Sequence, residues 1–325
     1  LLRASSVVMS RTGLEVLRRT PLVHFLAAVQ SLILAVVCST AVPAQELVPA
    51  SYTPAPYGVN VLSLASQYNT GDISFDPVLP IDVSDAKILG STLGYARTFS
   101  LVGRSANVGV IVPYVLGDLE GTYLGMPASA ERSGIGDMAF RGAVNLYGGP
   151  AMSPKEFSTY RPRTLIGTSL IIKCPTGQYD PSKLINIGTN RWSFKPEIGV
   201  VRVMGRWAID AYVGAWFFTD NTEFFGGRTR TQDPIYSTQA HLRYLFKPGL
   251  WAAVDGNFWI GGQSSINGSA NDDEQRNSRV GATLSTRLGA HHNLRFAVSV
   301  GAITRIGGNF KSVGVSYNYS WMRKP

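Results

Sequence analysis

Alternation of apolar and polar side chains is the dominant pattern in the second half of the chain. The last segment, Phe310 to Trp321, places Val313, Val315 and Tyr317 on one face and serine, glycine and asparagine on the other. Successive side chains of a strand point to opposite faces, so the pattern predicts a β-strand between an apolar and a polar environment. The strand by itself leaves open whether its apolar face meets a soluble core or lipid.

Twelve runs can be drawn with turn signals between them, and three of these, 59–68, 162–174 and 191–204, alternate poorly. The twelve runs cover residues 59–68, 87–100, 105–116, 134–147, 162–174, 191–204, 207–218, 234–246, 250–260, 276–289, 293–305 and 310–321. Gly205-Arg206 and Lys247-Pro248-Gly249 suit tight hairpin turns. Pro196 lies inside a run, where it cannot donate to the ladder, so we expect a bulge or bend there. These runs predict an all-β chain of antiparallel hairpins.

Connection lengths alternate along the chain. Long connections are expected at 69–86, 117–133, 175–190, 219–233 and 261–275, and short ones at 101–104, 205–206, 247–249 and 290–292. Residues 148–161 and 306–309 break the rule, and the first of these could fold inward as a constriction. Short turns at one end and long loops at the other are typical of a transmembrane antiparallel up-and-down β-barrel, here of about 12 strands.

The charge-free faces decide between lipid and a soluble core. The interior of a soluble twelve-strand barrel is difficult to fill with side chains, because a barrel of about eight strands already has the size that side chains can fill. A lipid-facing apolar belt avoids that problem, and a soluble barrel or sandwich is the less favoured alternative. Aromatic residues near the strand ends are expected to form girdles at the membrane surfaces. They are Trp207, Phe217, Phe246, Phe258, Tyr319 and Trp321.

Residues 1–44 are a different kind of sequence. A basic flank containing Arg18 and Arg19 precedes an uncharged apolar stretch, and Val42-Pro43-Ala44 follows it. This order predicts a signal peptide cleaved after Ala44, with a membrane anchor as the alternative. Its removal lowers the formal net charge from +9 to +6 and leaves Cys174 as the single cysteine. We expect 45–57 to lie in the periplasm and 58–325 to form the barrel in the bacterial outer membrane.

The polar faces carry isolated charges at mid-strand, and function is expected there. The predicted lumen-lining residues are Arg141, Lys195, Glu197, Asp210, His241, Arg243, Asp255, Arg279, Arg287, Arg295 and Arg305. Asp137 is assigned to the same face, so seven basic residues meet four acidic ones. Either the basic excess favours anions such as aromatic carboxylates, or the groups pair and plug the lumen. Lys195 and Glu197 share a face and are predicted to form an ion pair, either structural or in contact with a ligand.

The stretch from Cys174 to Val200 is rich in turn formers. It resembles the outer-membrane transporter family of the MetA pathway of phenol degradation, and the strand pattern over most of residues 57–321 agrees with this. The residues that carry the resemblance are Pro175, Thr176, Gly177, Tyr179, Asp180, Gly188, Asn190, Trp192 and Pro196. The resemblance implies an outer-membrane barrel that passes small hydrophobic or aromatic compounds, and it transfers no binding residue. A non-conducting structural or adhesion barrel acting through its loops is the alternative.

Catalytic and metal-binding signatures are not found in the sequence. A barrel phospholipase would need a serine and a histidine together at the lipid-facing rim, whereas His241 lies mid-strand and His291-His292 in a turn. Ser264-Ser265 reads as loop, and Asp272-Asp273-Glu274 as a solvated acidic run. We therefore predict no enzymatic activity, no cofactor and no metal. The expected partners are outer-membrane lipid and lipopolysaccharide, the barrel-insertion machinery and a small-molecule solute, but no nucleic acid, because the basic residues are scattered singly.

Overall fold

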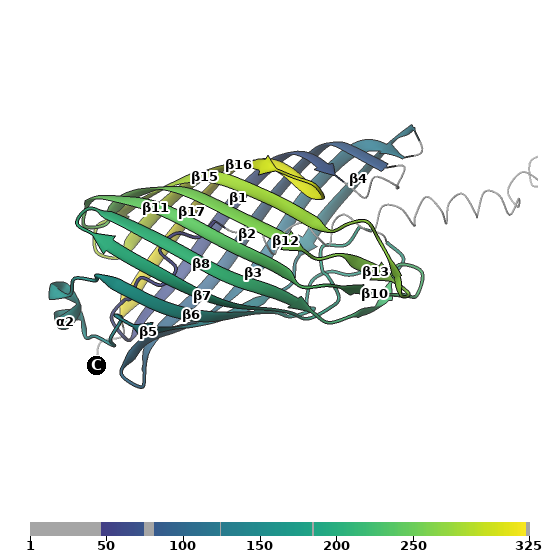
Figure 1. Cartoon of the computed structure of the whole chain (residues 1–325). Coiled ribbons are helices and arrows are strands. Elements are labelled where there is room, and N and C mark those ends of the chain that lie inside the picture. Colours follow the sequence, from purple (N-terminus) through teal and green to yellow (C-terminus); the bar gives the residue numbers. More distant parts are fainter. Residues whose placement is uncertain (1–46, 75–80, 124, 184, 323–325) are drawn as a thin grey trace, which may run out of the picture.

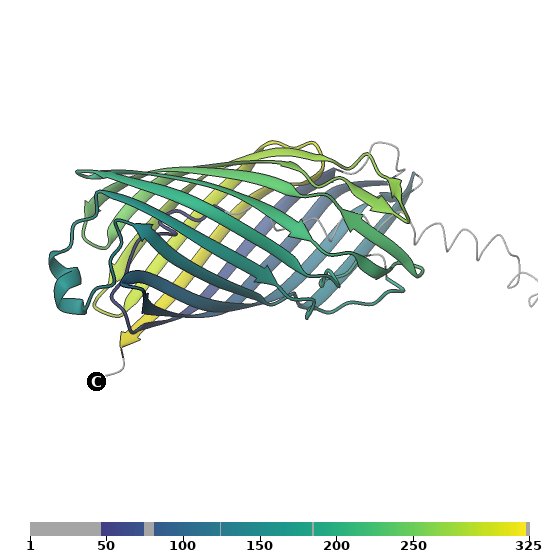
Figure 2. The same ribbon diagram turned by 60° about the horizontal axis from the view of Figure 1, so that its bottom comes forward.

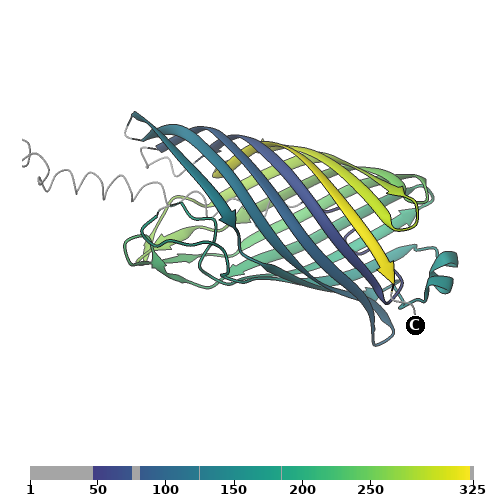
Figure 3. The same ribbon diagram turned by 180° about the vertical axis from the view of Figure 1, so that it is seen from behind.

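The computed structural model describes residues 47–74, 81–123, 125–183 and 185–322 (Figure 1). The predicted signal peptide lies outside these residues. Twelve strand positions close into an antiparallel barrel, because β1 pairs with both β2 and β17 (Figure 3). The barrel strands are β1 (Val59–Ser74), β2 (Ile81–Leu101), β3 (Arg104–Tyr123), β4 (Met126–Ile135), β5 (Ala139–Tyr147), β6 (Thr164–Lys173), β7 (Ser193–Met204), β8 (Trp207–Phe218), β11 (Ile235–Lys247), β12 (Leu250–Gly261), β15 (Gln275–Leu288), β16 (His292–Ile303) and β17 (Gly307–Met322).

One strand position is divided between β4 and β5. Both pair with β3, β4 along its second half and β5 along its first. The prediction of one strand over 134–147 and a loop over 117–133 is therefore wrong: β3 and β4 form a long hairpin instead. Asp118 and Glu131 face each other on its outer surface. Charges outside the apolar belt conceal strand periodicity. Figure 1 shows this hairpin at the far end of the barrel, where β2 pairs with β3 as far as Tyr123.

The outer surface of the barrel is apolar, as the alternation predicts. Leu64, Val254 and Val313 point outward and are 57%, 66% and 62% exposed. The predicted girdle residues Trp207, Phe217, Phe246, Phe258 and Tyr319 are also exposed. Side chains of this kind left in contact with water would be unfavourable, so the belt suits lipid. None of the helices in the described ranges is long and apolar enough to cross a membrane.

Tight turns gather at one end of the barrel, which we call the short-turn end. Two-residue hairpin turns lie there at Val102-Gly103 and Gly205-Arg206. Positive φ angles are found at Val102, Gly103 and Gly205, as the turn types favoured in two-residue hairpins require. The strand termini at Val59 and Met322 also lie at this end. The exceptional connection 148–161 contains α2 (Pro154–Thr159), which lies beyond the strands rather than inside the lumen (Figure 2).

The opposite end, the long-loop end, carries a second sheet. Its four strands are β9 (Asn221–Phe224), β10 (Arg228–Gln232), β13 (Ser264–Ile266) and β14 (Ser269–Ala270). The predicted loops 219–233 and 261–275 are therefore partly ordered as strands. The predicted loop 69–86 is shorter than expected, since β1 continues to Ser74 and β2 begins at Ile81.

Pro196 does not produce the predicted bulge. The register between β6 and β7 runs without a shift through Leu170 and Pro196. Pairing with β8 is interrupted only between Phe194 and Glu197 and resumes in the same register. The missing amide of proline thus removes a bond on one side without displacing the strand.

Candidate functional site: the barrel lumen

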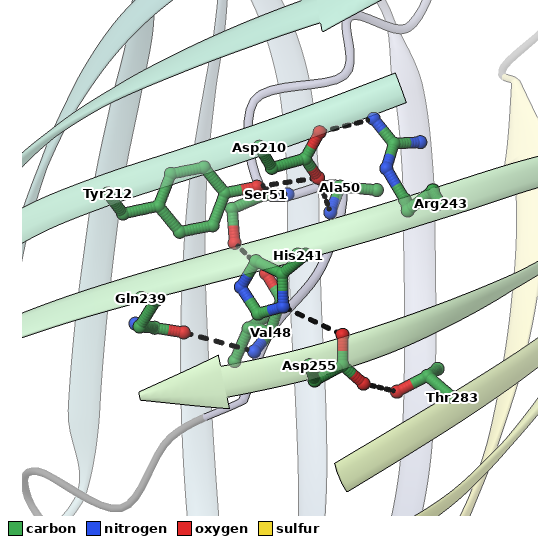
Figure 4. Close-up of polar contacts among 10 residues, drawn as sticks. All are labelled: Val48, Ala50, Ser51, Asp210, Tyr212, Gln239, His241, Arg243, Asp255 and Thr283. Atoms are coloured by element: carbon green, nitrogen blue, oxygen red, sulfur yellow. Dashed lines mark hydrogen bonds and ion pairs between the residues drawn. The ribbon is translucent and has the colours of Figure 1, made fainter. Parts of the chain in front are cut away.

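Residues 48–52 lie inside the barrel, and we call them the lumenal segment. The prediction that they lie in the periplasm is wrong. The Val48 amide donates to Gln239 Oε1 at 3.2 Å, and the Ala50 amide donates to Asp210 Oδ2 at 2.8 Å (Figure 4). The Ser51 amide donates to the Tyr212 hydroxyl at 3.1 Å. Side chains of β8 and β11 therefore satisfy the backbone of a segment that belongs to no sheet.

Tyr52 anchors the segment on a neighbouring part of the wall. Its side chain is buried, and its hydroxyl donates to Glu197 Oε1 at 3.0 Å and lies 3.1 Å from the Ser169 hydroxyl. The ring packs edge-on against Tyr212 with centroids 5.2 Å apart. The space for this ring comes from Gly167 and Gly199, where an added Cβ would lie 2.3 Å from it. Glycine at these positions lets the aromatic ring lie flat against β6 and β7.

The sequence offered little sign of this arrangement. Pro49 inside the segment and Pro54 and Pro56 just after it disfavour a strand ladder, and nothing in the pattern indicates burial. A buried tyrosine usually finds a partner for its hydroxyl, but the partner here lies 145 residues along the chain. Four further wall residues that make contacts were not predicted, because neutral polar side chains are ordinary on a lumenal face. They are Tyr212, Gln239, Ser169 and Thr283.

Most of the predicted lumenal charges face partners on the wall. Lys195 and Glu197 form the predicted ion pair, with Nζ and Oε2 3.0 Å apart. Arg243 Nη2 donates to Asp210 Oδ1 at 2.8 Å. All four side chains are buried. Removing such charges from water is costly unless they are paired and hydrogen-bonded, and the pairing meets that requirement.

His241 belongs to a third buried group. Its Nδ1 lies 2.7 Å from Asp255 Oδ1, and the Thr283 hydroxyl donates to Asp255 Oδ2 at 2.6 Å. The other two histidines of the described chain lie at the short-turn end, where His291 Nδ1 contacts the Ser320 carbonyl and His292 Nδ1 contacts the Tyr317 hydroxyl. Ser264 is buried at the long-loop end and donates to Asp273, so serine and histidine are not brought together there.

Three predicted arginines face the lumen with neutral partners. Arg279 donates to the Ser312 hydroxyl at 2.8 Å and to the Ser299 hydroxyl at 3.1 Å. Arg141 donates to Asn107 and lies over the Tyr52 ring. Arg295 lies over the Trp251 ring, 5.4 Å from its centroid. These guanidinium groups are therefore held by hydroxyl, amide and aromatic side chains.

The other residues assigned to the lumen lie outside the regular middle of the strands. Arg305 lies in the turn after β16 and pairs with Asp272 at the long-loop end. Arg287 is exposed at the short-turn end, where it donates to the Ala290 carbonyl. Asp137 lies in the break between β4 and β5. Asp273, expected in a solvated run, is buried and accepts from the Ser264 amide and hydroxyl.

Asp137 holds together the loop that carries the family motif. Its Oδ1 accepts from the Gly177 amide, and its Oδ2 accepts from the amide and hydroxyl of Thr189. Gly177 and Gly188 touch, so that a Cβ on Gly188 would lie 2.6 Å from backbone atoms of Gly177. The two motif glycines are thus explained by a close approach of two backbones.

Polar motif residues join this loop to the second sheet. The Tyr179 hydroxyl donates to the Glu223 carbonyl, and Asn190, whose φ is +51°, donates to Asn221. Asp180 accepts from the amide and hydroxyl of Ser182 and closes the turn. Trp192 is exposed and stacks on Phe194. The motif therefore builds the long-loop end.

The lumen wall has two different halves. Inward-facing side chains through the middle of β7, β8, β11, β12 and β15 are buried beneath the lumenal segment and one another. Those through the middle of β16, β17, β1, β2 and β3 remain partly exposed, which leaves solvent-accessible space along this half. At Gly90, an added Cβ would meet nothing within 4 Å. We call these five strands the open half.

The strands of the open half present little charge of their own, and the Arg279 guanidinium of β15 reaches them at Ser299 and Ser312. Among the described inward-facing residues through the middle of its strands, Arg295 is the one charged side chain. The others are small, apolar or neutral polar. They include Ser63, Ala65, Gln67, Gly90, Thr92, Gly94, Ile111, Pro113, Val115, Ala297, Gly314 and Ser316. The ion pairs and the accessible space thus lie on opposite sides of the lumen.

Comparison with known proteins gives one family. The model of the family described as "Putative MetA-pathway of phenol degradation" matches residues 70–319. No protein of curated function matches the sequence.

Solved structures with a similar fold include the following two. An outer membrane channel from Pseudomonas putida F1 is 21% identical, with a TM-score of 0.73, and the match covers 85% of this chain and 100% of that one. The transport unit of the autotransporter AIDA-I from Escherichia coli is 9% identical, with a TM-score of 0.54, over 89% of this chain and 96% of that one. At these identities the likeness concerns the barrel fold.

Proposed function

The chain belongs to this phenol-degradation family, and from that premise we propose that it is an outer-membrane channel for the passive passage of small hydrophobic or aromatic compounds. The observation that carries the proposal is the accessible, nearly uncharged open half of the lumen. An uncharged solute loses less hydration free energy there than an ion does, since few fixed charges are available to replace the water around an ion.

The paired charges argue against a general preference for anions. Lys195, Arg243 and His241 face Glu197, Asp210 and Asp255 on the other half of the wall. Their fields are largely cancelled by near neighbours, so these residues contribute little net charge, and the basic excess along the lumen is reduced to Arg141, Arg279 and Arg295. Of the two interpretations of these charges, pairing is the better supported.

A pair of glycine substitutions tests the passage. Gly90 faces the lumen and Gly142 faces outward, and at both positions an added Cβ would meet nothing within 4 Å. Gly90→Trp places an indole in the open half, whereas Gly142→Trp adds the same group on the lipid side. Cells that lack the chromosomal gene would be complemented with each variant, and their uptake of a labelled aromatic solute measured at micromolar concentration.

The expected result is a several-fold slower uptake with Gly90→Trp and wild-type uptake with Gly142→Trp. Ion conductance of the purified barrel in planar bilayers should fall in parallel. If neither variant changes uptake, and the wild-type barrel passes no ions and swells no liposomes, the channel proposal is wrong. A structural or adhesion barrel acting through the long-loop end would then be the better explanation.

Location and partners complete the proposal. The similar Pseudomonas putida protein is an outer membrane channel, which supports an outer-membrane location for this chain, with lipopolysaccharide around the long-loop end and the barrel-insertion machinery as assembly partner. Export would remove residues 1–44, leaving Gln45 as the first residue just before the lumenal segment. Mass spectrometry of the N-terminal peptide from purified outer membranes checks the cleavage site. A chain that keeps its apolar leader would contradict it.

A further inference from the structure

Charge is distributed unevenly between the two ends of the barrel. The strand ends and connections at the short-turn end carry nine basic residues and one acidic residue, within 97–104, 148–163, 202–207, 247–250 and 287–292. The acidic residue, Glu156, accepts from the amide and hydroxyl of Ser153 in the first turn of α2. No ion pair between described residues includes any of these nine basic side chains. The short-turn end therefore presents positive charge that the chain itself does not neutralise.

The opposite end has the reverse balance. The long-loop connections 174–192, 219–233 and 261–275 together carry seven acidic residues and four basic ones. On the outer surface of the β3–β4 hairpin, Asp118 and Glu131 face each other. The two ends of the barrel thus differ in sign, and a negatively charged surface would be attracted to the short-turn end alone.

Two of the nine basic residues lie on the lipid-facing surface rather than at the tips of the turns. Arg97 is exposed in an outward-facing row of β2, between the exposed side chains of Tyr95 and Phe99. Its neighbour on β3, Val108, is exposed as well. An arginine in such surroundings keeps its stem on apolar side chains and extends its guanidinium group toward the membrane surface. Arg97 therefore places a cation at the edge of the apolar belt.

Arg202 is the second of these residues. It follows Ile198 and Val200 in the outward-facing row of β7, and its neighbour on β8 is the exposed Ile209. Its Nη1 donates to the Thr164 hydroxyl at 2.5 Å. This neutral partner holds the guanidinium group against β6 and leaves its charge uncompensated.

Aromatic side chains mark the level of the membrane surface beside Arg202. Trp207 and Tyr244 pair one step closer to the turn, and their rings pack edge to face with centroids 4.8 Å apart. Phe246 packs against Tyr244 in the same way at 5.0 Å, and Arg206 in the turn donates to the Tyr244 hydroxyl at 3.5 Å. Tyrosine and tryptophan gather where the apolar part of a membrane meets its headgroups. Arg202 and Arg206 flank this level, which is the depth of the headgroups.

We propose that the short-turn end binds anionic phospholipids of its own leaflet, with Arg97 and Arg202 holding lipid phosphates at the edge of the apolar belt. A guanidinium group donates two parallel hydrogen bonds to a phosphate, and the basic turns nearby attract the net negative charge of the headgroup. A soluble acidic protein would meet the turn tips, whereas Arg97 and Arg202 point sideways into lipid. The inference goes beyond the channel function and requires only that the barrel lies in a bilayer.

Stability in vesicles of two compositions tests this preference. The purified barrel is folded into phosphatidylcholine and into equal parts of phosphatidylcholine and phosphatidylglycerol with the same acyl chains, and thermal unfolding is followed by the gel shift. Phosphatidylglycerol should raise the midpoint by about 3 °C or more. Concentrated sodium chloride should remove most of the rise, because salt screens charges near a surface. Inorganic phosphate added to phosphatidylcholine vesicles should leave the midpoint unchanged, which separates a lipid headgroup from a free anion.

Variants assign the effect to the two arginines. A chain with both Arg97→Gln and Arg202→Gln should lose most of the rise. Arg276→Gln is the matched control, because Arg276 is an exposed arginine beside Ile260 on the outer surface of the long-loop end, and it should keep the whole rise.

Three results would overturn the proposal. They are an absent rise in the wild type, an undiminished rise in the double variant, and an equal rise when soluble polyglutamate is added to phosphatidylcholine vesicles. The last of these would indicate an acidic protein as the partner instead. Since no passage of solute is measured, failure here leaves the proposed channel function untouched.

Discussion

The backbone amide of Ala50 donates a hydrogen bond of 2.8 Å to Oδ2 of Asp210, whose Oδ1 accepts from Arg243 at 2.8 Å. One buried carboxylate therefore satisfies the lumenal segment and neutralises a wall arginine at the same time. Both contacts depend on the charge of Asp210, because an amide in its place would direct hydrogens toward one of these two donors.

Asp210→Asn is expected to loosen the lumenal segment and to lower the free energy of unfolding by about 3–5 kcal/mol, since it leaves the Arg243 charge without its partner. Single-channel conductance in planar bilayers should rise as the segment leaves the wall. Asp255→Asn is the matched control, because Asp255 pairs with His241 and Thr283 and has no hydrogen bond to the segment. Equal conductance in the two variants would show that Asp210 does not hold the segment.

Tyr52→Phe removes the hydroxyl that joins the lumenal segment to Glu197 and Ser169. Glu197 keeps its contacts with Lys195 and Gln239, so the expected loss of stability is modest, about 1–2 kcal/mol. Urea titration of the folded barrel in detergent measures it. Tyr57→Phe, at an exposed tyrosine just outside the lumenal segment, should cost less than half as much. A larger loss at Tyr57 would contradict the anchoring role of Tyr52.

Gly188→Ala places a methyl group against the backbone of Gly177, where no flexible side chain can give way. We expect the motif loop to shift, with a loss of about 1–3 kcal/mol. Limited proteolysis should cut residues 174–192 several-fold faster than in wild type. Gly142→Ala, at an outward-facing glycine with open space, is expected to leave the rate unchanged. Wild-type protease resistance of Gly188→Ala would argue against the close backbone contact.

Neighbouring substitutions on β16 test which face meets lipid. Val298 points outward and is 52% exposed, whereas Ala297 faces the open half of the lumen. Val298→Arg should cost about 2–4 kcal/mol, as arginine does on the lipid face near the membrane midplane, and should reduce the folded fraction in vesicles. Ala297→Arg should fold nearly as well as wild type. The reverse order of the two variants would mean that the faces are wrongly assigned.

Strand positions were predictable because strand periodicity is local. The run 207–218 coincides with β8, and 250–260 differs from β12 by one residue. In these segments each side chain meets either lipid or the lumen, so its polarity reports its direction. The prediction failed along β3 and β4, where Asp118 and Glu131 stand on an outer surface beyond the apolar belt. Outside lipid, both faces can be polar and the period disappears.

Within the regular strands, the sequence by itself determined which side chains face inward, since that follows from parity along each strand. Lys195 and Glu197 could be paired because they stand two residues apart on one strand. Only the tertiary structure decided what the other inward charges meet. Tyr52 and Glu197, separated by 145 residues, are joined by barrel closure and by a segment without periodicity. Long-range contacts of this kind leave no local pattern, and they divide the lumen into a filled half and an open one.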